Sequence, residues 1–237
     1  MTSDWRFGPW LALIASLWPT PFACAANIAV DVGHYWDNPG AISARGVPEF
    51  EYNLKLARET ARALRRAGHE IFLIGGDGLA EDLYSRAALA NGMDLFISIH
   101  HDSVQARFLK EWEHEGEKRL YAEGFSGFSV FVSQLNPRTD ASLRCASAIG
   151  HAMRRTGFTP SRYHADPIRG ENRPFADEAN GVHYFDNLAV LRTASIPALL
   201  FEAGVIVDRD EEMRLRDPAV RKKIAEGIAA AIGNCLA

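Results

Sequence analysis

The sequence predicts an α/β fold: a single domain built on a central mixed, largely parallel sheet with helices on both faces. Short runs rich in β-branched residues alternate with helical patterns along the chain, as a series of βαβ units requires. The run Leu95–Ile99 is almost continuously apolar, which is typical of a strand buried on both faces of a sheet. With 237 residues, 47% of them hydrophobic, the chain can bury one sizeable core.

The elements follow one another in an order that fits this fold. A first strand is expected at residues 27–32. A helix is expected at 51–67, where Leu54, Ala57, Ala61 and Leu64 recur at helical spacing and Gly68 marks the end. The further expected elements are a strand at 70–74, a helix at 80–91, strands at 95–99 and 127–133, a helix at 140–156, a strand at 198–201 and a closing helix at 218–236.

Two segments fit the alternation poorly. Residues 104–126 are rich in charged and aromatic side chains and lie between two predicted strands, so we interpret them as an insertion. The insertion is expected to be a surface helix along the wall of the cleft, or a lid whose Glu111, Glu113, His114 or Glu115 covers an active site. Residues 157–187 form a second long, turn-rich segment, and such loops in compact domains are usually functional or mobile.

The N-terminus resembles an export signal. Residues 1–25 contain Arg6, an apolar stretch from Trp10 to Trp18 and the small-residue triplet ACA, so the mature catalytic domain is expected to span residues 26–237. A buried first helix is the alternative. The exported protein would be periplasmic, or else extracellular, and would keep Cys145 and Cys235, whose pairing the sequence leaves open.

Charge and hydropathy exclude two classes of partner. The net charge is −4 and no block of Lys or Arg interrupts the chain, so no nucleic-acid partner is expected. The apolar stretch near the N-terminus is too short for a permanent membrane helix, so no stable span is expected after cleavage.

Four residues carry the predicted chemistry: His34, Glu51, His100 and Glu202. Each stands where an apolar run gives way to a loop or where a helix begins. Two imidazoles and one carboxylate form a hydrolytic zinc set with an open coordination position, so we expect one Zn²⁺ per chain. Glu202, in the apolar LLFEAG, is the expected catalytic base, because burying a carboxylate there is costly unless it has a function.

Two positions compete with these ligands. His101 adjoins His100, but successive strand residues point to opposite faces, so only His100 is expected to reach the metal. Glu49 lies two residues before Glu51, and the expected start of the helix favours Glu51.

The same segments resemble a known family over nearly all of the expected mature chain. DVGH and PGA, the Glu before YNLKLA, SRAALAN, SIHHDS and LAVLRTASIPALLFEAGVI are similar to the zinc-dependent N-acetylmuramoyl-L-alanine amidases of the Amidase_3 family. The resemblance implies that His34, Glu51 and His100 bind zinc and that Glu202 assists the water. It also implies hydrolysis of the amide between N-acetylmuramic acid and L-alanine in peptidoglycan. Tyr35-Trp36 replaces the usual small glycines, and His101-Asp102 replaces a small residue and Asn.

Substrate contacts and a partner are predicted more loosely. Trp36 could stack on a sugar ring, and His164 and Arg192 are further candidate contacts with peptidoglycan. An activator protein of unknown identity is expected if residues 104–126 form a lid.

Other functions remain open from the sequence. A catalytically silent peptidoglycan-binding module would have no need for Glu202, and a different zinc peptidase or amidase acting on cell-wall peptides is the closest enzymatic alternative. A serine hydrolase is disfavoured because Ser126, in GFSGF, lacks the final glycine of a nucleophile elbow.

Overall fold

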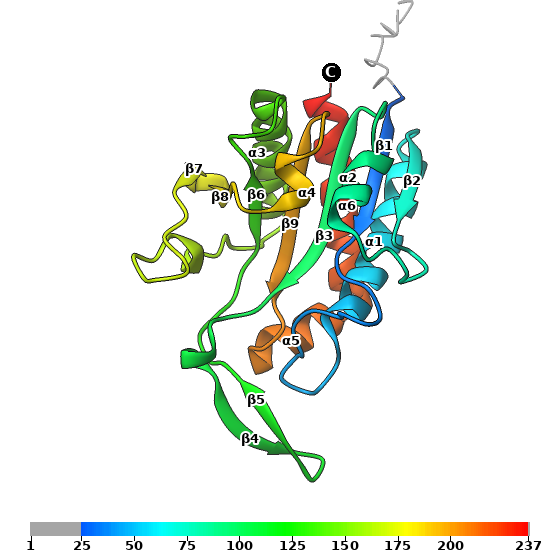
Figure 1. Ribbon diagram of the computed structural model, residues 1–237. Coiled ribbons are helices and arrows are strands. Elements are labelled where there is room, and N and C mark those ends of the chain that lie inside the picture. Colours follow the sequence, from blue (N-terminus) through cyan, green and yellow to red (C-terminus); the bar gives the residue numbers. More distant parts are fainter. Residues whose placement is uncertain (1–24, 237) are drawn as a thin grey trace, which may run out of the picture.

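The computed structural model describes residues 25–236 (Figure 1). The expected export signal therefore lies outside the described residues, apart from Ala25. None of the helices in residues 25–236 is long and apolar enough to cross a bilayer.

A seven-stranded mixed sheet forms the centre of the domain, in the order β2-β1-β3-β9-β6-β8-β7. β1, β2, β3 and β9 are parallel, β6 is antiparallel to β9, β8 is parallel to β6, and β7 is antiparallel to β8. The strands are β1 (Asn27–Val32), β2 (Glu70–Ile74), β3 (Leu95–Asp102), β6 (Ser129–Val132), β7 (Phe175–Asp177), β8 (Val182–Tyr184) and β9 (Ala198–Val205).

Helices cover both faces of this sheet, which confirms the predicted fold class (Figure 1). One face carries three long helices, α1 (Glu49–Arg66), α3 (Thr139–Arg155) and α6 (Pro218–Cys235). The other carries the short helices α2 (Leu83–Leu89) and α4 (Ala189–Arg192). α5 (Arg209–Arg216) follows β9, and three short 3-10 helices complete the list: η1 (Ala106–Phe108), η2 (Tyr163–Ala165) and η3 (Glu178–Asn180).

Side-chain alternation along the strands decides which residues face which helices. In β3, Ile97 and Ile99 belong to the core under α1, α3 and α6, whereas Phe96 belongs to the core under α2 and α4. His100 therefore points to the same face as Phe96. Because β1, β3 and β9 are parallel, their carboxyl ends meet at one edge of the sheet, and residues at these ends come together.

Residues 110–121 form a β-hairpin, so the expectation of a surface helix was wrong. β4 (Lys110–His114) pairs with β5 (Glu117–Tyr121) in antiparallel register. The turn residues Glu115 and Gly116 have φ of 52° and 79°. Two successive residues with positive φ form the turn that matches the twist of a hairpin, so this Glu-Gly pair was the local signal.

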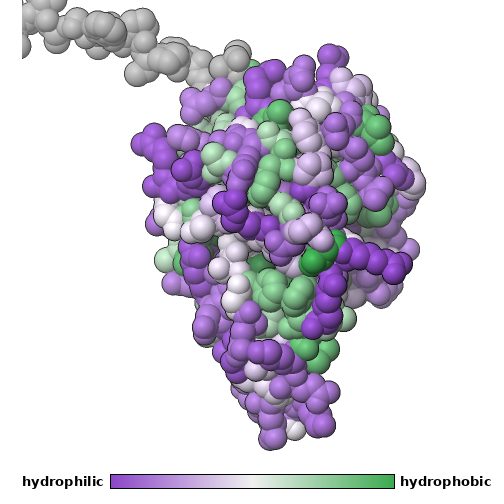
Figure 2. All heavy atoms as spheres, turned by 90° about the vertical axis from the view of Figure 1, so that its left-hand side faces the viewer, coloured by the Kyte–Doolittle hydropathy of each residue, from purple (hydrophilic) through white to green (hydrophobic). Residues whose placement is uncertain are grey.

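The hairpin projects beyond the edge of the sheet where β1, β3 and β9 end (Figure 1). Trp112 donates its indole N–H to the carbonyl of Ala44, 3.0 Å away. Figure 2 shows a hydrophilic tip and hydrophobic side chains gathered where the hairpin joins the domain. A small core lies there, on which half-buried Phe108, Leu109, Phe125 and Ile168 pack.

A disulfide joins α3 to α6. Cys145 and Cys235, whose pairing the sequence left open, have Cα atoms 5.0 Å apart and are 90 residues apart in the chain. α6 is the last helix, so the disulfide fixes the C-terminal segment to the body of the domain.

Replacing both cysteines, Cys145→Ala with Cys235→Ala, should lower the free energy of unfolding by about 4 kcal/mol, because a cross-link closing a long loop restricts the unfolded chain. Urea unfolding with and without a reductant measures this. Reductant should destabilise the parent and leave the double variant unchanged. Equal curves for parent and variant in the absence of reductant would contradict the prediction.

Candidate metal centre and active site

Three side chains meet at the carboxyl edge of the sheet: His34, Glu49 and His100. Nε2 of His34 lies 3.0 Å from Oε2 of Glu49, and Nδ1 of His100 lies 3.1 Å from Oε1 of the same carboxylate. One ligand atom from each residue lies within 4.8 Å of the others. The two imidazole rings stand edge to face, with centroids 5.0 Å apart. The three residues therefore offer three ligand atoms that are close enough to bind one metal ion.

Hydrogen bonds from Arg86 of α2 fix the backbone around His34. His34 follows β1 with a φ of 67°, in the left-handed region that few residues with a side chain adopt. Arg86 is fully buried, pairs with Asp31 at 2.6 Å, and donates to the carbonyls of Val32 and His34. The strained position of His34 is thus stabilised by a buried cation rather than by local preference.

Two glycines make room for the ligands. A Cβ atom on Gly33 would stand 2.3 Å from the His100 ring, and one on Gly40 would stand 2.3 Å from Oε2 of Glu49. Any larger residue at Gly33 would displace His100. The DVGH and PGA motifs therefore supply space as well as a ligand.

Backbone and side-chain donors fix the Glu49 carboxylate. Oε2 accepts from the amide of Ala41 at 3.1 Å. Oε1 accepts from Nδ2 of Asn53 at 3.0 Å and from the amide of His101 at 3.3 Å. Burial by itself would raise the pKa of Glu49, but the hydrogen bonds and charges of His100 and His34 hold it well below its usual range.

The structure corrects the predicted carboxylate ligand: Glu49 joins the cluster and Glu51 does not. Glu51 lies two residues further along α1, on its outer side, and pairs with Lys55 one turn later at 3.3 Å. Residues two apart on a helix point in nearly opposite directions, so only one of the two can reach the sheet. The helix begins at Glu49 rather than at Glu51, which is why the expected start led to the wrong choice.

His101 points away from the cluster, as strand alternation predicts. Its Nδ1 lies 2.8 Å from Oδ1 of Asn53, and its ring packs against Tyr52 under α1. Burial lowers the pKa of His101 to about 3, so it is a neutral core residue. Through Asn53 it helps to orient Glu49.

Glu202 lies in β9 beside His100, its register partner in β3. Its neighbours Phe201 and Ala203 belong to the core under α1, so the side chain of Glu202 lies on the same face as His100. Burial, together with the negative charge of Asp102, raises the pKa of Glu202 well above its usual range. Its buried Oε2 atom has no hydrogen-bond partner within residues 25–236.

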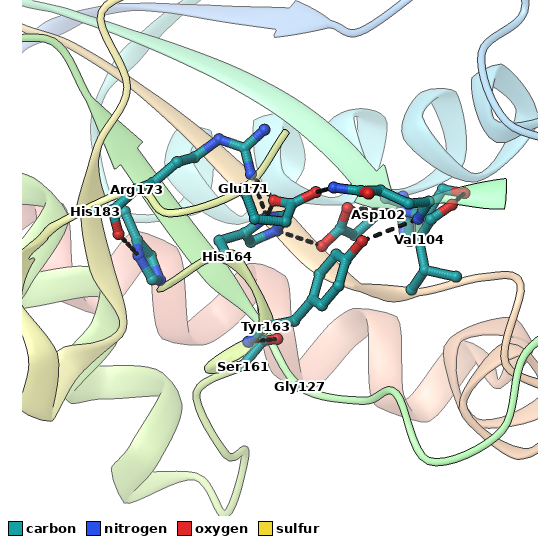
Figure 3. A network of polar contacts seen from close by, with 12 residues as sticks. Asp102, Val104, Gly127, Ser161, Tyr163, His164, Glu171, Arg173 and His183 are labelled. Atoms are coloured by element: carbon teal, nitrogen blue, oxygen red, sulfur yellow. Dashed lines mark hydrogen bonds and ion pairs between the residues drawn. The ribbon is translucent and has the colours of Figure 1, made fainter. Parts of the chain in front are cut away.

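A second polar network stands next to this site (Figure 3). Nε2 of His164 lies 2.6 Å from Oδ2 of Asp102, at the end of β3, and its Nδ1 lies 2.9 Å from Oε2 of Glu171. Arg173 donates to Glu171 as well. Burial by itself would lower the pKa of His164, but Asp102 and Glu171 raise it to about 9. The negative charges of Asp102 and Glu171 are thus balanced by the positive charges of His164 and Arg173.

His164 therefore has a structural role in this network, because both of its ring nitrogens already contact carboxylates. Gln105 strengthens the network by donating Nε2 to Oε1 of Glu171 at 2.9 Å. Tyr163 accepts from the amide of Gln105 at 2.9 Å. The segment 157–187, which the sequence suggested to be functional or mobile, supplies four of the network residues: Tyr163, His164, Glu171 and Arg173.

The other two predicted substrate contacts, Trp36 and Arg192, lie in different parts of the domain. Trp36 is exposed on the loop that follows His34. Arg192 ends α4, which packs beside α2 against the face of the sheet, and the structure does not bring it to the cluster. Glu111 and Glu113 also remain outside the metal-ligand group in the described part of the chain.

The donors suit a zinc ion. Two imidazole nitrogens and one carboxylate oxygen are the ligands that hydrolytic zinc sites use, and they leave a position for water or substrate. The glycine at 33 keeps the space that the His100 ring needs. A cation held there would also offset the negative charges that surround Glu202.

Comparison with known proteins identifies the family of the chain. Residues 28–234 match the family Amidase_3, described as N-acetylmuramoyl-L-alanine amidase. The chain is 25% identical over 228 residues to the N-acetylmuramoyl-L-alanine amidase AmiC of Neisseria meningitidis, covering 86% of this chain and 51% of that protein. It is 27% identical over 240 residues to the probable amidase AmiB of Haemophilus influenzae, covering 88% and 52%. The chain thus spans about half the length of these curated relatives.

Solved structures share the fold. The amidase Ami1 of Mycobacterium smegmatis superposes with a TM-score of 0.71 at 20% identity, covering 89% of this chain and 96% of that one. The CwlD amidase of Clostridioides difficile, solved in complex with the GerS lipoprotein, has a TM-score of 0.65 at 18% identity, with coverage of 89% and 98%.

Glu49→Gln should abolish metal binding, because two histidines alone hold a divalent cation poorly, whereas Glu51→Gln should bind metal like the parent. The two positions belong to the same helix and receive the same isosteric change, so each controls for the other. Metal analysis after dialysis, together with calorimetric titration of zinc, measures the difference. Equal retention in both variants would contradict the assignment of Glu49.

His164→Gln should cost stability in a pH-dependent way. The folded pKa of His164 lies above its ordinary value of 6.5, at about 9, so its stabilising contribution is complete below about pH 6.5 and is lost as the pH rises through 9. The difference in unfolding free energy between parent and variant should therefore shrink by up to about 3 kcal/mol between pH 6 and pH 10. Urea unfolding at both pH values tests this, with His151→Gln, an exposed position in α3, as the matched control. A constant difference would show that His164 is not held as a cation.

Proposed function

The chain belongs to the Amidase_3 family, and from this premise we propose that it hydrolyses the amide between N-acetylmuramic acid and the L-alanine of peptidoglycan stem peptides. The observation that carries the proposal is the His34–Glu49–His100 group with the Glu202 carboxylate on the same face of the sheet. Relatives named N-acetylmuramoyl-L-alanine amidase support the same bond.

His34, Glu49 and His100 would hold one zinc ion. Bound there, zinc would polarise the substrate carbonyl and lower the pKa of water, which is the chemistry that a hydrolytic site with an open position supplies. Asn53, Ala41 and the His101 backbone orient Glu49 toward that position, and Arg86 holds the backbone of His34.

Glu202 acts as the general base and then as the general acid. It takes a proton from the attacking water as the water oxygen bonds to the lactyl carbonyl carbon. It then delivers this proton to the nitrogen of L-alanine as the carbon–nitrogen bond breaks, leaving a carboxylic acid on the sugar and a free peptide amine. The Oε2 atom without a hydrogen-bond partner in residues 25–236 is the oxygen available for this transfer.

Two alternatives remain distinct from this proposal. A silent peptidoglycan-binding module would gain nothing from Glu202, whose buried Oε2 atom has no hydrogen-bond partner among residues 25–236 and is therefore costly to keep. A zinc enzyme that cleaves another amide of the cell-wall peptide would use the same residues, so product identity separates it from an amidase.

The proposed setting is outside the cytoplasm. The Cys145–Cys235 disulfide supports an oxidising compartment, in keeping with the export signal expected at residues 1–25 and with the periplasm as the site of action. Peptidoglycan is the proposed partner. The structural neighbour CwlD was solved with the lipoprotein GerS, and an activator protein of unknown identity is proposed here by analogy.

Glu202→Gln should keep zinc and lower turnover by roughly 10²- to 10⁴-fold, the usual contribution of a positioned acid–base group. Purified peptidoglycan is incubated with parent and variant, with and without a chelator, and the products are identified by mass spectrometry. The parent should release stem peptides that begin with a free L-alanine. Peptides cut at another bond would support the other zinc hydrolase, and binding without products from the parent would support the silent module.

A further inference from the structure

We propose that Trp36 is a stacking platform for the sugar ring of the substrate, an inference that rests on the proposed function. The acyl part of the scissile amide is a lactyl group attached to the muramic acid ring. A sugar must therefore lie a few bonds from the carbonyl that reaches His34, Glu49 and His100. The structure places an exposed aromatic side chain, Trp36, two residues after His34 and in contact with Phe50, the residue after Glu49.

Trp36 lies close to two metal-ligand residues along the chain or through one intervening side chain. It lies two residues after His34. Its ring packs edge to face on Phe50, the residue after Glu49, with centroids 4.6 Å apart. Phe50 is fully buried, so this contact anchors the indole to the first turn of α1.

The indole is held in one orientation. Its N–H donates to the carbonyl of Asp77 at 3.0 Å, and the amide of Trp36 donates to the carbonyl of Gly78 at 3.1 Å. A Cβ atom on Gly78 would stand 2.2 Å from the indole nitrogen, so the ring lies directly on the glycine backbone. A ring fixed before binding loses little conformational entropy when a ligand covers it.

The exposure of Trp36 is the feature that packing does not explain. Its side chain is 52% exposed although it is the largest residue of its loop. Half of its surface serves the contacts with Phe50 and Gly78, and the other half faces solvent. Sugar rings present apolar C–H faces that pack on such a surface while their hydroxyl groups stay hydrated.

Four other aromatic side chains, Trp112, Tyr121, Phe125 and Tyr163, are half-buried or buried and pack on neighbouring side chains. Arg45 and Arg209 lie 5.5 and 5.2 Å from the Trp112 ring centre, and Arg209 lies 3.9 Å from that of Tyr121. Phe125 and Tyr163 pack on each other, with centroids 5.2 Å apart. Of these five side chains, Trp36 is the one that is more than half exposed.

Binding is tested first without catalysis. Peptidoglycan glycan strands stripped of stem peptides contain the sugar but no scissile amide, so they report binding alone. The full chain is titrated with these strands while its indole N–H resonances are followed by NMR, and Trp36→Phe and Trp112→Phe assign the two relevant signals. The Trp36 resonance should shift with saturation, and that of Trp112 should not. No shift at Trp36, or equal shifts at both, would overturn the proposal.

Kinetics supply the second test. Trp36→Ala should raise KM on peptidoglycan by about tenfold with kcat little changed, and Trp36→Phe should recover part of the loss because it keeps an aromatic face and the contact with Phe50. Tyr84→Ala, at a 57% exposed aromatic position in α2, is the matched control and should behave like the parent. Zinc content and thermal unfolding identify a variant that has failed to fold, in which case Trp36→Phe alone decides the kinetic test.

The outcomes separate this inference from the proposed function. If the parent hydrolyses peptidoglycan but glycan strands do not shift the Trp36 resonance, the proposed function stands and the stacking platform is rejected. If the parent binds the strands through Trp36 but releases no peptide, the stacking platform stands and the amidase function is rejected.

Discussion

The burial of one carboxylate, that of Glu49, is the constraint on which the site depends. Because this carboxylate is removed from water, its oxygen atoms need hydrogen-bond or ion-pair partners within the protein. Two backbone amides, the Asn53 side chain and the His34 and His100 rings provide them. A buried charge that lost these partners would destabilise the fold by several kcal/mol. Helix α1, the loop after β1 and the end of β3 are therefore fixed relative to one another by the same atoms that form the metal-ligand group.

Arg86 has the same role on the other side of His34. Its guanidinium is fully buried and joins α2 to β1 through Asp31, whose second oxygen accepts from Ser98 of β3 at 2.6 Å. Removing one member of such a buried pair costs about 3–5 kcal/mol. Since Arg86 also binds the carbonyl of His34, the unusual backbone of that ligand depends on a helix that contributes no residue to the site itself.

The Asp102–His164–Glu171–Arg173 network joins the end of β3 to the segment 157–187 (Figure 3). It lets the turn-rich segment 157–187 lie against the end of β3 without leaving a buried charge unbalanced. The negative charge of Asp102 is matched by His164, whose pKa the two carboxylates Asp102 and Glu171 raise to about 9.

The sequence by itself determined the layered fold, the strands at 27–32 and 70–74, and the placing of His34, His100 and Glu202 in or just after buried strands, because periodicity and alternation are local properties of the chain. It also held the clue to Glu49 that was missed: Glu51 and Lys55 have the spacing of an exposed pair, whereas Glu49 and Asn53 lie on the opposite, buried side. Only the tertiary structure decided between the two glutamates, joined Cys145 to Cys235 and placed Arg192 away from the site. Each of these depends on which face of an element packs against a segment distant in the chain, and spacing along the sequence does not specify that.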